Sequence, residues 1–352
     1  MPLTWSLVIA TYKRAHILPR CLLLAAEQTR PPIQIVVVDA SPDFETCRQQ
    51  VLSEIAPTFP NISWEYVAAE RASSASQRNQ GVRLATGDVL FLIDDDSLMY
   101  PDCAEEAMKI YEADTENKIG GIALVHVPQP PEKARDRAEA NKPATPSPNS
   151  FLRKLKYNLH RPFRAESTHL PYDDRYPDHK LPDSVQGMAI TPIRMIGGCF
   201  MTLRREMAIR EPFEVCLERY AAAEDLDESY RVSRHAALVR AFRARIHHVA
   251  ASGGRVSRFS AIALGALNFA VLHRLNSTNL DRSKRLYRRI LWKRFSLTLS
   301  ADIVKRRWNL PTSRAILFSI RKLDHIFAMP KEELRAWYPQ FQRELIEAHS
   351  SK

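Results

Sequence analysis

Three consecutive aspartates directly follow the apolar run 89–93; they are Asp94, Asp95 and Asp96. Short apolar runs are typical of buried strands, and ligand sites in open α/β sheets lie beyond the carboxyl ends of the strands. Adjacent carboxylates repel one another, so a neighbouring positive charge must offset them. A divalent cation, which prefers oxygen ligands, would do so. The alternative is a solvated turn in which Asp96 caps a helix that starts near Pro101.

The elements around this cluster alternate between strand and helix patterns. Residues 5–10 and 33–39 are expected to be buried strands, and the second of them ends in Asp39. A helix is expected over residues 73–85, just before the strand that carries the aspartates. Such alternation predicts an α/β fold with a mostly parallel sheet. Asp39 and the three aspartates would then line one edge of that sheet.

Two further groups of polar residues occur in the second half of the chain. Glu224 and Asp225 precede an expected helix at 226–234, where an acid is often only a cap. His247 and His248 follow an expected strand at 238–246. Because adjacent strand residues face opposite ways, we do not expect both histidines to bind one ion.

Five segments resemble, in order, the motifs of family 2 glycosyltransferases with the GT-A fold, a Rossmann-like mixed, mostly parallel sheet flanked by helices. They are residues 6–14, 35–39, 77–96, 196–205 and 223–231. Each motif is weak alone, and their common order makes the resemblance specific. It covers roughly residues 4–255 and implies an inverting, nucleotide-sugar-dependent enzyme.

The resemblance also implies roles for individual residues. Asp225 is expected to be the general base that takes the proton of the attacking hydroxyl. Asp96 and His248 are expected to bind a divalent metal, Mn²⁺ or Mg²⁺, with His248 matching better than His247. The expected contacts to the nucleotide sugar are Thr11, Arg14, Asp39, Arg78, Asp94, Asp95 and Arg255. Gly197, Gly198 and Glu224 are expected on the acceptor side.

Several of these residues have structural alternatives. Asp39 could be an ordinary strand-end cap, and Arg78 a structural partner of the acids. Arg255 could lie in a plain turn, and the Gly197–Gly198 pair could mark a strand bulge. Asp227 and Glu228 are expected to face solvent or to pair with Arg231.

Composition narrows the class of protein. The 352 residues carry a formal charge of +11. Residues 255–322 hold sixteen Lys and Arg against two acids, a net +14, which leaves about −3 for the rest of the chain. The five cysteines form no Cys-x-x-Cys pair, so neither a disulfide framework nor a zinc site is indicated. With no signal-peptide pattern and no long apolar run, we expect a cytoplasmic protein.

We expect four regions along the chain. Residues 1–127 are the expected nucleotide-sugar-binding half and residues 187–255 the acceptor and catalytic half. Between them, 128–186 form a proline-rich insertion, which we expect to be a partly ordered excursion on the acceptor side. Residues 256–352 form a basic helical extension, with helices expected at 257–275, 282–299, 313–328 and 331–348.

The expected partners are a nucleoside-diphosphate sugar and a hydroxyl-bearing saccharide or lipid-linked acceptor. The stretch 284–297 has an amphipathic pattern that suggests contact with an anionic membrane on its inner face. The alternative is that its apolar side packs against protein. A nucleotidyltransferase is disfavoured because the loop after the first strand lacks glycine. A basic nucleic-acid-binding protein is disfavoured because no binding motif accompanies the charge.

Overall fold

The computed structural model describes residues 2–134, 170–173, 175–218, 221–249 and 256–349. The chain divides into two compact units. The first combines residues 1–134 with 176–255, and the second combines 135–175 with 256–352. Each unit is described by itself.

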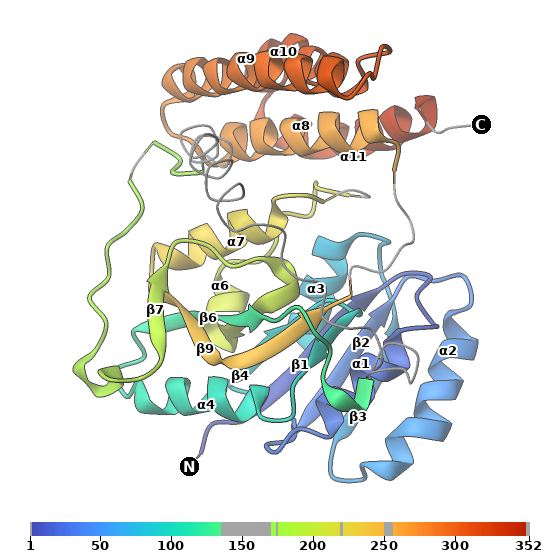
Figure 1. Cartoon of the computed structure of the whole chain (residues 1–352), viewed down its shortest axis with the longest axis vertical. Helices are drawn as coiled ribbons and strands as arrows, with labels where there is room; N and C mark the ends of the chain where they lie inside the picture. Colours follow the sequence, from blue (N-terminus) through green and yellow to red (C-terminus); the bar gives the residue numbers. More distant parts are fainter. Residues whose placement is uncertain (1, 135–169, 174, 219–220, 250–255, 350–352) are drawn as a thin grey trace. The chain divides into compact units, whose positions relative to one another are not determined.

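The first unit is an α/β structure built on one sheet (Figure 1). Its strands are β1 (Trp5–Thr11), β2 (Gln34–Asp39), β3 (Ser63–Ala68), β4 (Val89–Leu92), β5 (Ser97–Met99), β6 (Ile119–His126), β7 (Ile190–Ile193), β8 (Met201–Arg204) and β9 (Ala237–His248). Its α-helices are α1 (Leu18–Ala26), α2 (Phe44–Gln50), α3 (Ser74–Leu84), α4 (Cys103–Ala113), α6 (Arg205–Arg210) and α7 (Glu224–Ser233).

The strands follow the order β3-β2-β1-β4-β8-β6-β9-β5, and β7 also pairs with β9. β1, β2, β3 and β4 are parallel neighbours, and β6 and β9 run in the same direction as these four. β8, β5 and β7 run in the opposite direction. The carboxyl ends of β1, β2 and β4 therefore meet at one edge of the sheet.

The sheet is buried on both faces, as the continuous apolar strands predict. Successive residues of β1 point to opposite faces, so Leu7 and Ile9 join one apolar core while Val8 joins another. Helices α1 and α4 contribute to the first core, and α3, α6 and α7 contribute to the second. Gly81 of α3 permits this packing, because a Cβ there would lie 2.4 Å from a methyl carbon of Val8.

The α/β class, the mostly parallel sheet and the C-terminal helices predicted from the sequence are confirmed. The proline-rich segment falls largely outside the described residues. Its described parts include two short 3₁₀ turns, Glu132–Ala134 and Asp183–Val185.

The second unit is helical and contains α8 (Arg258–Asn276), α9 (Leu280–Val304), α10 (Pro311–Ala328) and α11 (Lys331–Ala348). The four helices expected from the sequence are confirmed. Side chains cap the first turns of α8 and α9. The Ser257 hydroxyl accepts a hydrogen bond from Ser260 N at 3.1 Å, and the Asn279 side chain accepts one from Arg282 N at 3.1 Å. Among the described residues, no helix is both long and apolar enough to cross a bilayer.

Part of the apolar side of the stretch 284–297 is buried within this helical unit. Tyr287, Ile290 and Leu291 are buried, and the Tyr287 hydroxyl donates to the Ala266 carbonyl of α8 at 2.6 Å. The packing alternative therefore holds for these three residues, whereas Leu286 is exposed. Contact with a membrane stays a prediction.

Candidate active site

The candidate site lies where β1, β2 and β4 end and where β9 reaches the loop after β4. His248, the last residue of β9, pairs in register with Ser97, which directly follows the three aspartates. This pairing brings an imidazole from the far end of the chain to the acid cluster. The expected neighbourhood of the aspartates, Thr11, Arg14 and His248 is therefore present.

Asp95 is buried and held by two side chains from the end of β1 and the loop after it. The Thr11 hydroxyl donates to it at 2.7 Å, and Arg14 Nη1 lies 3.1 Å from its other oxygen. Burial raises the pKa of Asp95 to about 6, against the opposing effects of Thr11 and Arg14. Asp95 thus anchors the loop and is not free for a ligand without rearrangement.

Asp96 joins Arg14 to His248. Its Oδ2 accepts from Arg14 at 2.7 Å, and its Oδ1 lies 3.0 Å from His248 Nε2. The hydrogen bond with Asp96 raises the pKa of His248. Asp94 Oδ2 lies 3.8 Å from the same imidazole nitrogen. Two carboxylates therefore face one imidazole, which is a donor set suited to a divalent ion.

Ligand atoms of Asp94, Cys199 and His248 lie within 4.8 Å of one another. Mn²⁺ and Mg²⁺ prefer carboxylate oxygens, whereas thiolate sulfur is a soft ligand that favours other metals. The carboxylates and His248 therefore form the better set of ligands for such a metal ion, and Cys199 lies beside them.

His247 takes a different position, as the alternation along a strand predicts. Its Nδ1 donates to the Val127 carbonyl at 2.9 Å, and its ring stacks on that of His126. This arrangement makes His247 a structural residue and a natural control for His248.

Arg78 is the buried link between the acid cluster and α7. Its Nη2 lies 2.7 Å from Asp94 Oδ1 and its Nη1 lies 2.7 Å from Glu224 Oε1. Ser74 donates to the same Glu224 oxygen at 2.6 Å. Arg78 is thus paired with acids on both sides, and its contact with the nucleotide sugar stays a prediction.

Gly198 lies directly against this guanidinium. A Cβ at Gly198 would be 2.9 Å from Arg78 Nη2, whereas a Cβ at Gly197 would meet nothing closer than 3.8 Å. Only Gly198 is thus required for close approach. The segment forms a 3₁₀ turn, Gly198–Phe200, instead of the strand bulge considered from the sequence.

Asp225 occupies the first turn of α7 and accepts two backbone hydrogen bonds. Gly198 N donates to Oδ2 at 2.7 Å and Leu226 N donates to Oδ1 at 2.9 Å. Burial raises the pKa of Asp225, opposed by these donors and by Arg78. Ala223, just before the helix, has a φ of 80°, an uncommon conformation for alanine. A raised pKa makes a carboxylate a better proton acceptor than an exposed aspartate is.

Asp39, at the end of β2, has a hydrogen bond to each oxygen. Tyr66 donates its hydroxyl at 2.6 Å and Ser41 donates its backbone N–H at 2.7 Å. Tyr66, Ser74 and Cys199 were not singled out in the sequence, because hydroxyls and thiols in these settings carry no distinctive spacing. Arg255 lies outside the described residues.

Glu228 differs from its expected position. Asp227 does pair with Arg231, at 2.9 Å. Glu228, one turn after Glu224 on α7, is instead fully buried, and neither carboxyl oxygen has a hydrogen-bond partner. Burial raises its pKa well above the usual value, with Arg231, Asp227, Arg78 and Asp225 as the charged groups around it. We therefore expect Glu228 to keep its proton to a higher pH in the folded protein than an exposed glutamate does.

We expect Glu228→Gln to stabilise the protein increasingly as the pH rises. The unfolded chain ionises Glu228 above about pH 4.3, whereas the folded chain keeps the proton. Wild-type stability therefore falls by up to about 1.4 kcal/mol per pH unit from this group alone. Glutamine removes that dependence at nearly constant volume. Urea unfolding of both proteins between about pH 5 and pH 7 measures the difference, and a pH-independent difference would contradict a neutral Glu228.

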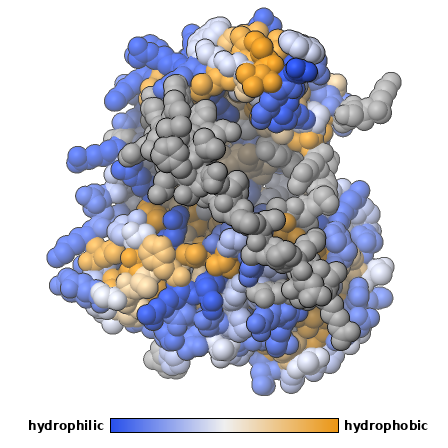
Figure 2. Space-filling model, viewed as in Figure 1, coloured by the Kyte–Doolittle hydropathy of each residue, from blue (hydrophilic) through white to orange (hydrophobic). Residues whose placement is uncertain are grey.

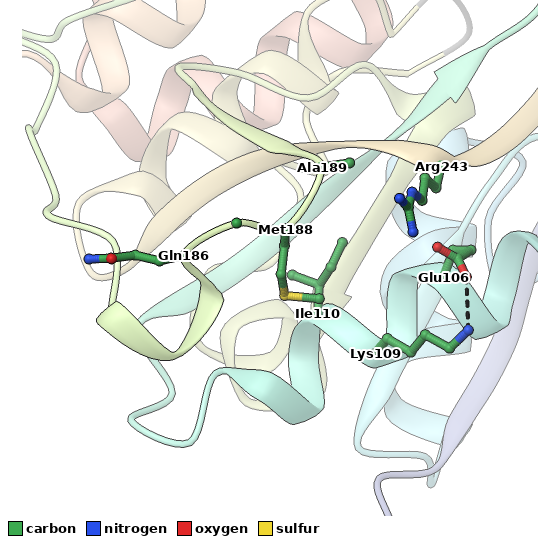
Figure 3. A pocket seen from close by; sticks show the side chains of 8 residues that line it. Glu106, Lys109, Ile110, Gln186, Met188, Ala189 and Arg243 are labelled. Carbon is green, nitrogen blue, oxygen red and sulfur yellow. Dashed lines mark hydrogen bonds and ion pairs between the residues drawn. The ribbon is translucent and has the colours of Figure 1, made fainter.

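A separate pocket of ≈ 380 Å³ lies in the first unit (Figure 3). Its lining comes from α4, from the turn that precedes β7, and from β9. Lys109 and Arg243 are among its lining residues, and Lys109 pairs with Glu106 there. None of the lining residues belongs to the candidate active site.

Comparison with known families agrees with this geometry. Residues 6–171 match the model of the family described as Glycosyl transferase family 2. The chain contains a family 2 glycosyltransferase domain. The GT-A fold that the sequence resemblance implies is in keeping with the sheet described above.

The chain is also similar to individual proteins. An uncharacterized glycosyltransferase of Haemophilus influenzae is 26% identical over 107 residues, which are 30% of this chain and 34% of that protein. The chain therefore matches about a third of that relative's length. Among solved structures, a Pyrobaculum calidifontis mannosyltransferase in complex with GDP-Man and Mn²⁺ is 18% identical, with a TM-score of 0.49 and coverage of 99% of this chain and 86% of that one. TarS 1–349 of S. aureus in complex with UDP-GlcNAc is 15% identical, with a TM-score of 0.48 and coverage of 99% and 89%.

Proposed function

We propose that this chain is a metal-dependent, inverting glycosyltransferase that moves a sugar from a nucleoside-diphosphate sugar to a hydroxyl acceptor. One observation carries the proposal. Asp225 and the acid cluster are joined by a continuous set of contacts, from Asp94 to Arg78, from Arg78 to Gly198, and from Gly198 N to Asp225. A candidate base and a candidate diphosphate site therefore lie on opposite sides of one buried guanidinium.

The proposed reaction is a single displacement. The acceptor hydroxyl forms a bond to the anomeric carbon while its proton passes to the Asp225 carboxylate. The bond between the anomeric carbon and the diphosphate oxygen breaks, and the electron pair leaves with the nucleoside diphosphate. One base and no second nucleophile imply inversion at the anomeric carbon. The base is expected to contribute roughly 10²–10⁴-fold.

Asp96 and His248, with Asp94 beside them, would hold the metal ion. When bound, such an ion neutralises charge on the leaving diphosphate. Asp96 Oδ1 and His248 Nε2, 3.0 Å apart, already converge and would exchange their mutual contact for contacts to the ion. Arg14, which contacts both Asp95 and Asp96, would then be close to the diphosphate as a further positive charge.

The remaining assignments belong to the same proposal. Thr11, Asp39 and Arg255 would lie on the nucleotide side, and Glu224 with the Gly197–Gly198 turn on the acceptor side. The acceptor would be a saccharide or a lipid-linked saccharide, as in polysaccharide or glycolipid assembly at the cytoplasmic side of a membrane.

The test is a panel of nucleoside-diphosphate sugars with and without Mn²⁺. A donor at 100 times its dissociation constant should add about 2.7 kcal/mol to the free energy of unfolding. Turnover should release free nucleoside diphosphate. Release of pyrophosphate from a nucleoside triphosphate would instead identify a nucleotidyltransferase.

His248→Ala should raise the Mn²⁺ concentration needed for donor binding far more than His247→Ala does. Loss of an outer partner of a metal ligand already costs about 10–100-fold in metal affinity, so loss of a ligand should cost at least as much. The matched control, His247, contacts Val127 and His126 instead of the acid cluster. Metal titrations monitored by nucleotide binding give both values, and a larger effect at His247 would exchange the two assignments.

A further inference from the structure

The turn between α9 and α10 presents large apolar side chains to solvent. Val304 is 80% exposed and Trp308 is 74% exposed, the highest values among the exposed large apolar residues of the described chain. We call residues 303–310 the α9–α10 tip. Figure 2 shows apolar surface bordered by hydrophilic surface over the helical unit that carries this tip. Leaving such side chains in water gives up the burial energy of each, so their position requires an explanation.

The tip is a built turn. Buried Asp302 accepts from Thr312 N at 3.1 Å and from Ser313 N at 3.0 Å, which caps α10 from the end of α9. Arg307 N donates to the Asp302 carbonyl at 2.8 Å, and Leu310 N donates to the Arg307 carbonyl at 2.8 Å. These bonds hold the backbone on both sides of Trp308.

Two left-handed residues complete this turn. Arg306 has a φ of 52° and Leu310 a φ of 48°, conformations that cost energy for residues other than glycine. The hydrogen bonds to Asp302 and Arg307 compensate for part of that strain. The projection of Val304 and Trp308 is therefore a property of the fold.

An apolar stripe on α9 leads to the tip. Trp292, Phe295, Leu299 and Ile303 recur at helical spacing, opposite the buried Tyr287 and Ile290. Trp292 and Ile303 are each 48% exposed, and Phe295 and Leu299 are half-buried. The stripe and the tip thus form one apolar surface on the side of α9 that faces away from the other helices.

The charge around this surface is mainly positive. Residues 280–324, which span α9, the tip and most of α10, contain thirteen Lys and Arg against three acids, Asp281, Asp302 and Asp324. Asp324 pairs with Lys284 and Arg288 on the part of α9 that precedes the tip. Asp302 is buried and already used in the cap. The exposed Lys305 and Arg306 directly follow Val304, and Arg314 is exposed in the first turn of α10.

We propose that the α9–α10 tip inserts into the interface of an anionic lipid bilayer. Trp308 would take the headgroup level that tryptophan favours, while Ile303 and Val304 enter the acyl boundary. Lys305, Arg306 and Arg314 would contact anionic headgroups, each contributing through an attraction that salt screens. This proposal does not depend on the transferase activity proposed above.

The same charge disfavours the other occupants. A two-fold interface joins the same surface of both copies. Two basic α9–α10 hairpins would therefore face and repel each other in a dimer formed through this surface. Nucleic acid would be attracted by the charge and could stack on Trp308, but it would leave the aliphatic Ile303 and Val304 without an apolar partner. An anionic bilayer satisfies both the basic rim and the aliphatic centre.

The test uses the full chain and sedimentation with vesicles of phosphatidylcholine alone or mixed with phosphatidylglycerol. Wild type should bind the anionic vesicles at low salt, bind less at high salt, and not bind neutral vesicles. Val304→Ser with Trp308→Ser should lower the partition coefficient at least about tenfold. Lys305→Gln with Arg314→Gln should weaken binding and reduce its salt dependence.

The control exchanges exposed apolar residues of the first unit, Ile209→Ser with Phe242→Ser, and should leave vesicle binding unchanged. Thermal unfolding checks that each variant is folded. Failure of wild type to bind anionic vesicles, or unchanged binding by the Val304 and Trp308 variant, would overturn the proposal. The proposal would also be overturned if wild type formed a dimer that the Val304 and Trp308 variant converts to monomers. Retention of wild type on nucleic acid, without binding to vesicles, would overturn it as well. Donor turnover in the same variants is measured separately, so that loss of docking and loss of transferase activity are distinguished.

Discussion

Asp225→Asn should lower the turnover number by roughly 10²–10⁴-fold while the dissociation constant for nucleoside diphosphate and Mn²⁺ changes little. The amide cannot accept the proton of the acceptor hydroxyl. It also has one oxygen where the carboxylate has two, so one of the N–H donors from Gly198 and Leu226 loses its acceptor. Single-turnover measurements and nucleotide titrations separate the two parameters.

The matched control for this variant is Asp227→Asn, two residues along the same helix. Asp227 is fully buried and pairs with Arg231 at 2.9 Å. Its amide should lower thermal stability and leave turnover per folded molecule unchanged. If Asp225→Asn instead weakens nucleotide binding and keeps its maximal rate, Asp225 is not the base.

Arg78→Met should lower the free energy of unfolding by about 3–5 kcal/mol, the cost of removing one partner from a buried ion pair. Glu224 would lose its basic partner, and Asp94 would lose its hydrogen bond to the same guanidinium. Thermal and urea unfolding of the variant and of wild type, both without ligand, measure this change.

Arg83→Met on the same helix is the control for Arg78→Met. Arg83 and its partner Glu70 are both largely exposed, and such pairs contribute at most about 1 kcal/mol. Combining Arg78→Met with Glu224→Gln should recover part of the lost stability, because the second change removes the stranded carboxylate. If Arg78→Met and Arg83→Met lowered the free energy of unfolding equally, Arg78 would not form a buried ion pair. Strictly additive losses for Arg78→Met and Glu224→Gln would contradict the pair as well.

The parts of the fold that the sequence predicts well are those with continuous apolar runs. Residues 5–10 and 33–39 became β1 and β2, and the run before the aspartates became β4, because two-sided burial demands such runs. The short β5, β7 and β8 were missed. Each has three or four residues, too few for a period to be recognised, and antiparallel pairing within a mixed sheet places them.

The candidate site divides in a similar way. Strand-end acids and the Glu224–Asp225 pair are visible as motifs. The alternation along a strand predicts that His247 and His248 do not both bind one ion, and the choice of His248 follows from the family resemblance. The buried state of Glu228 is not visible, because a single acid in a polar helix reads as a solvent-facing residue. The joining of Asp94 to Glu224 through Arg78 depends on contacts between residues far apart in the sequence. The metal, the base and the contacts to substrate stay predictions.

The position of β9 has a consequence for the order in which the protein can fold. β9 is the last strand along the chain, yet it lies between β6 and β5 in the sheet. β5, which directly follows the three aspartates, therefore has no described strand partner until residue 237 and those after it have been synthesised. Pairings between distant segments form slowly, because the long intervening loop must close first. During synthesis, the loop that carries the acid cluster would remain without its final partner until β9 arrives, so a chain that ends before β9 should lack the completed site.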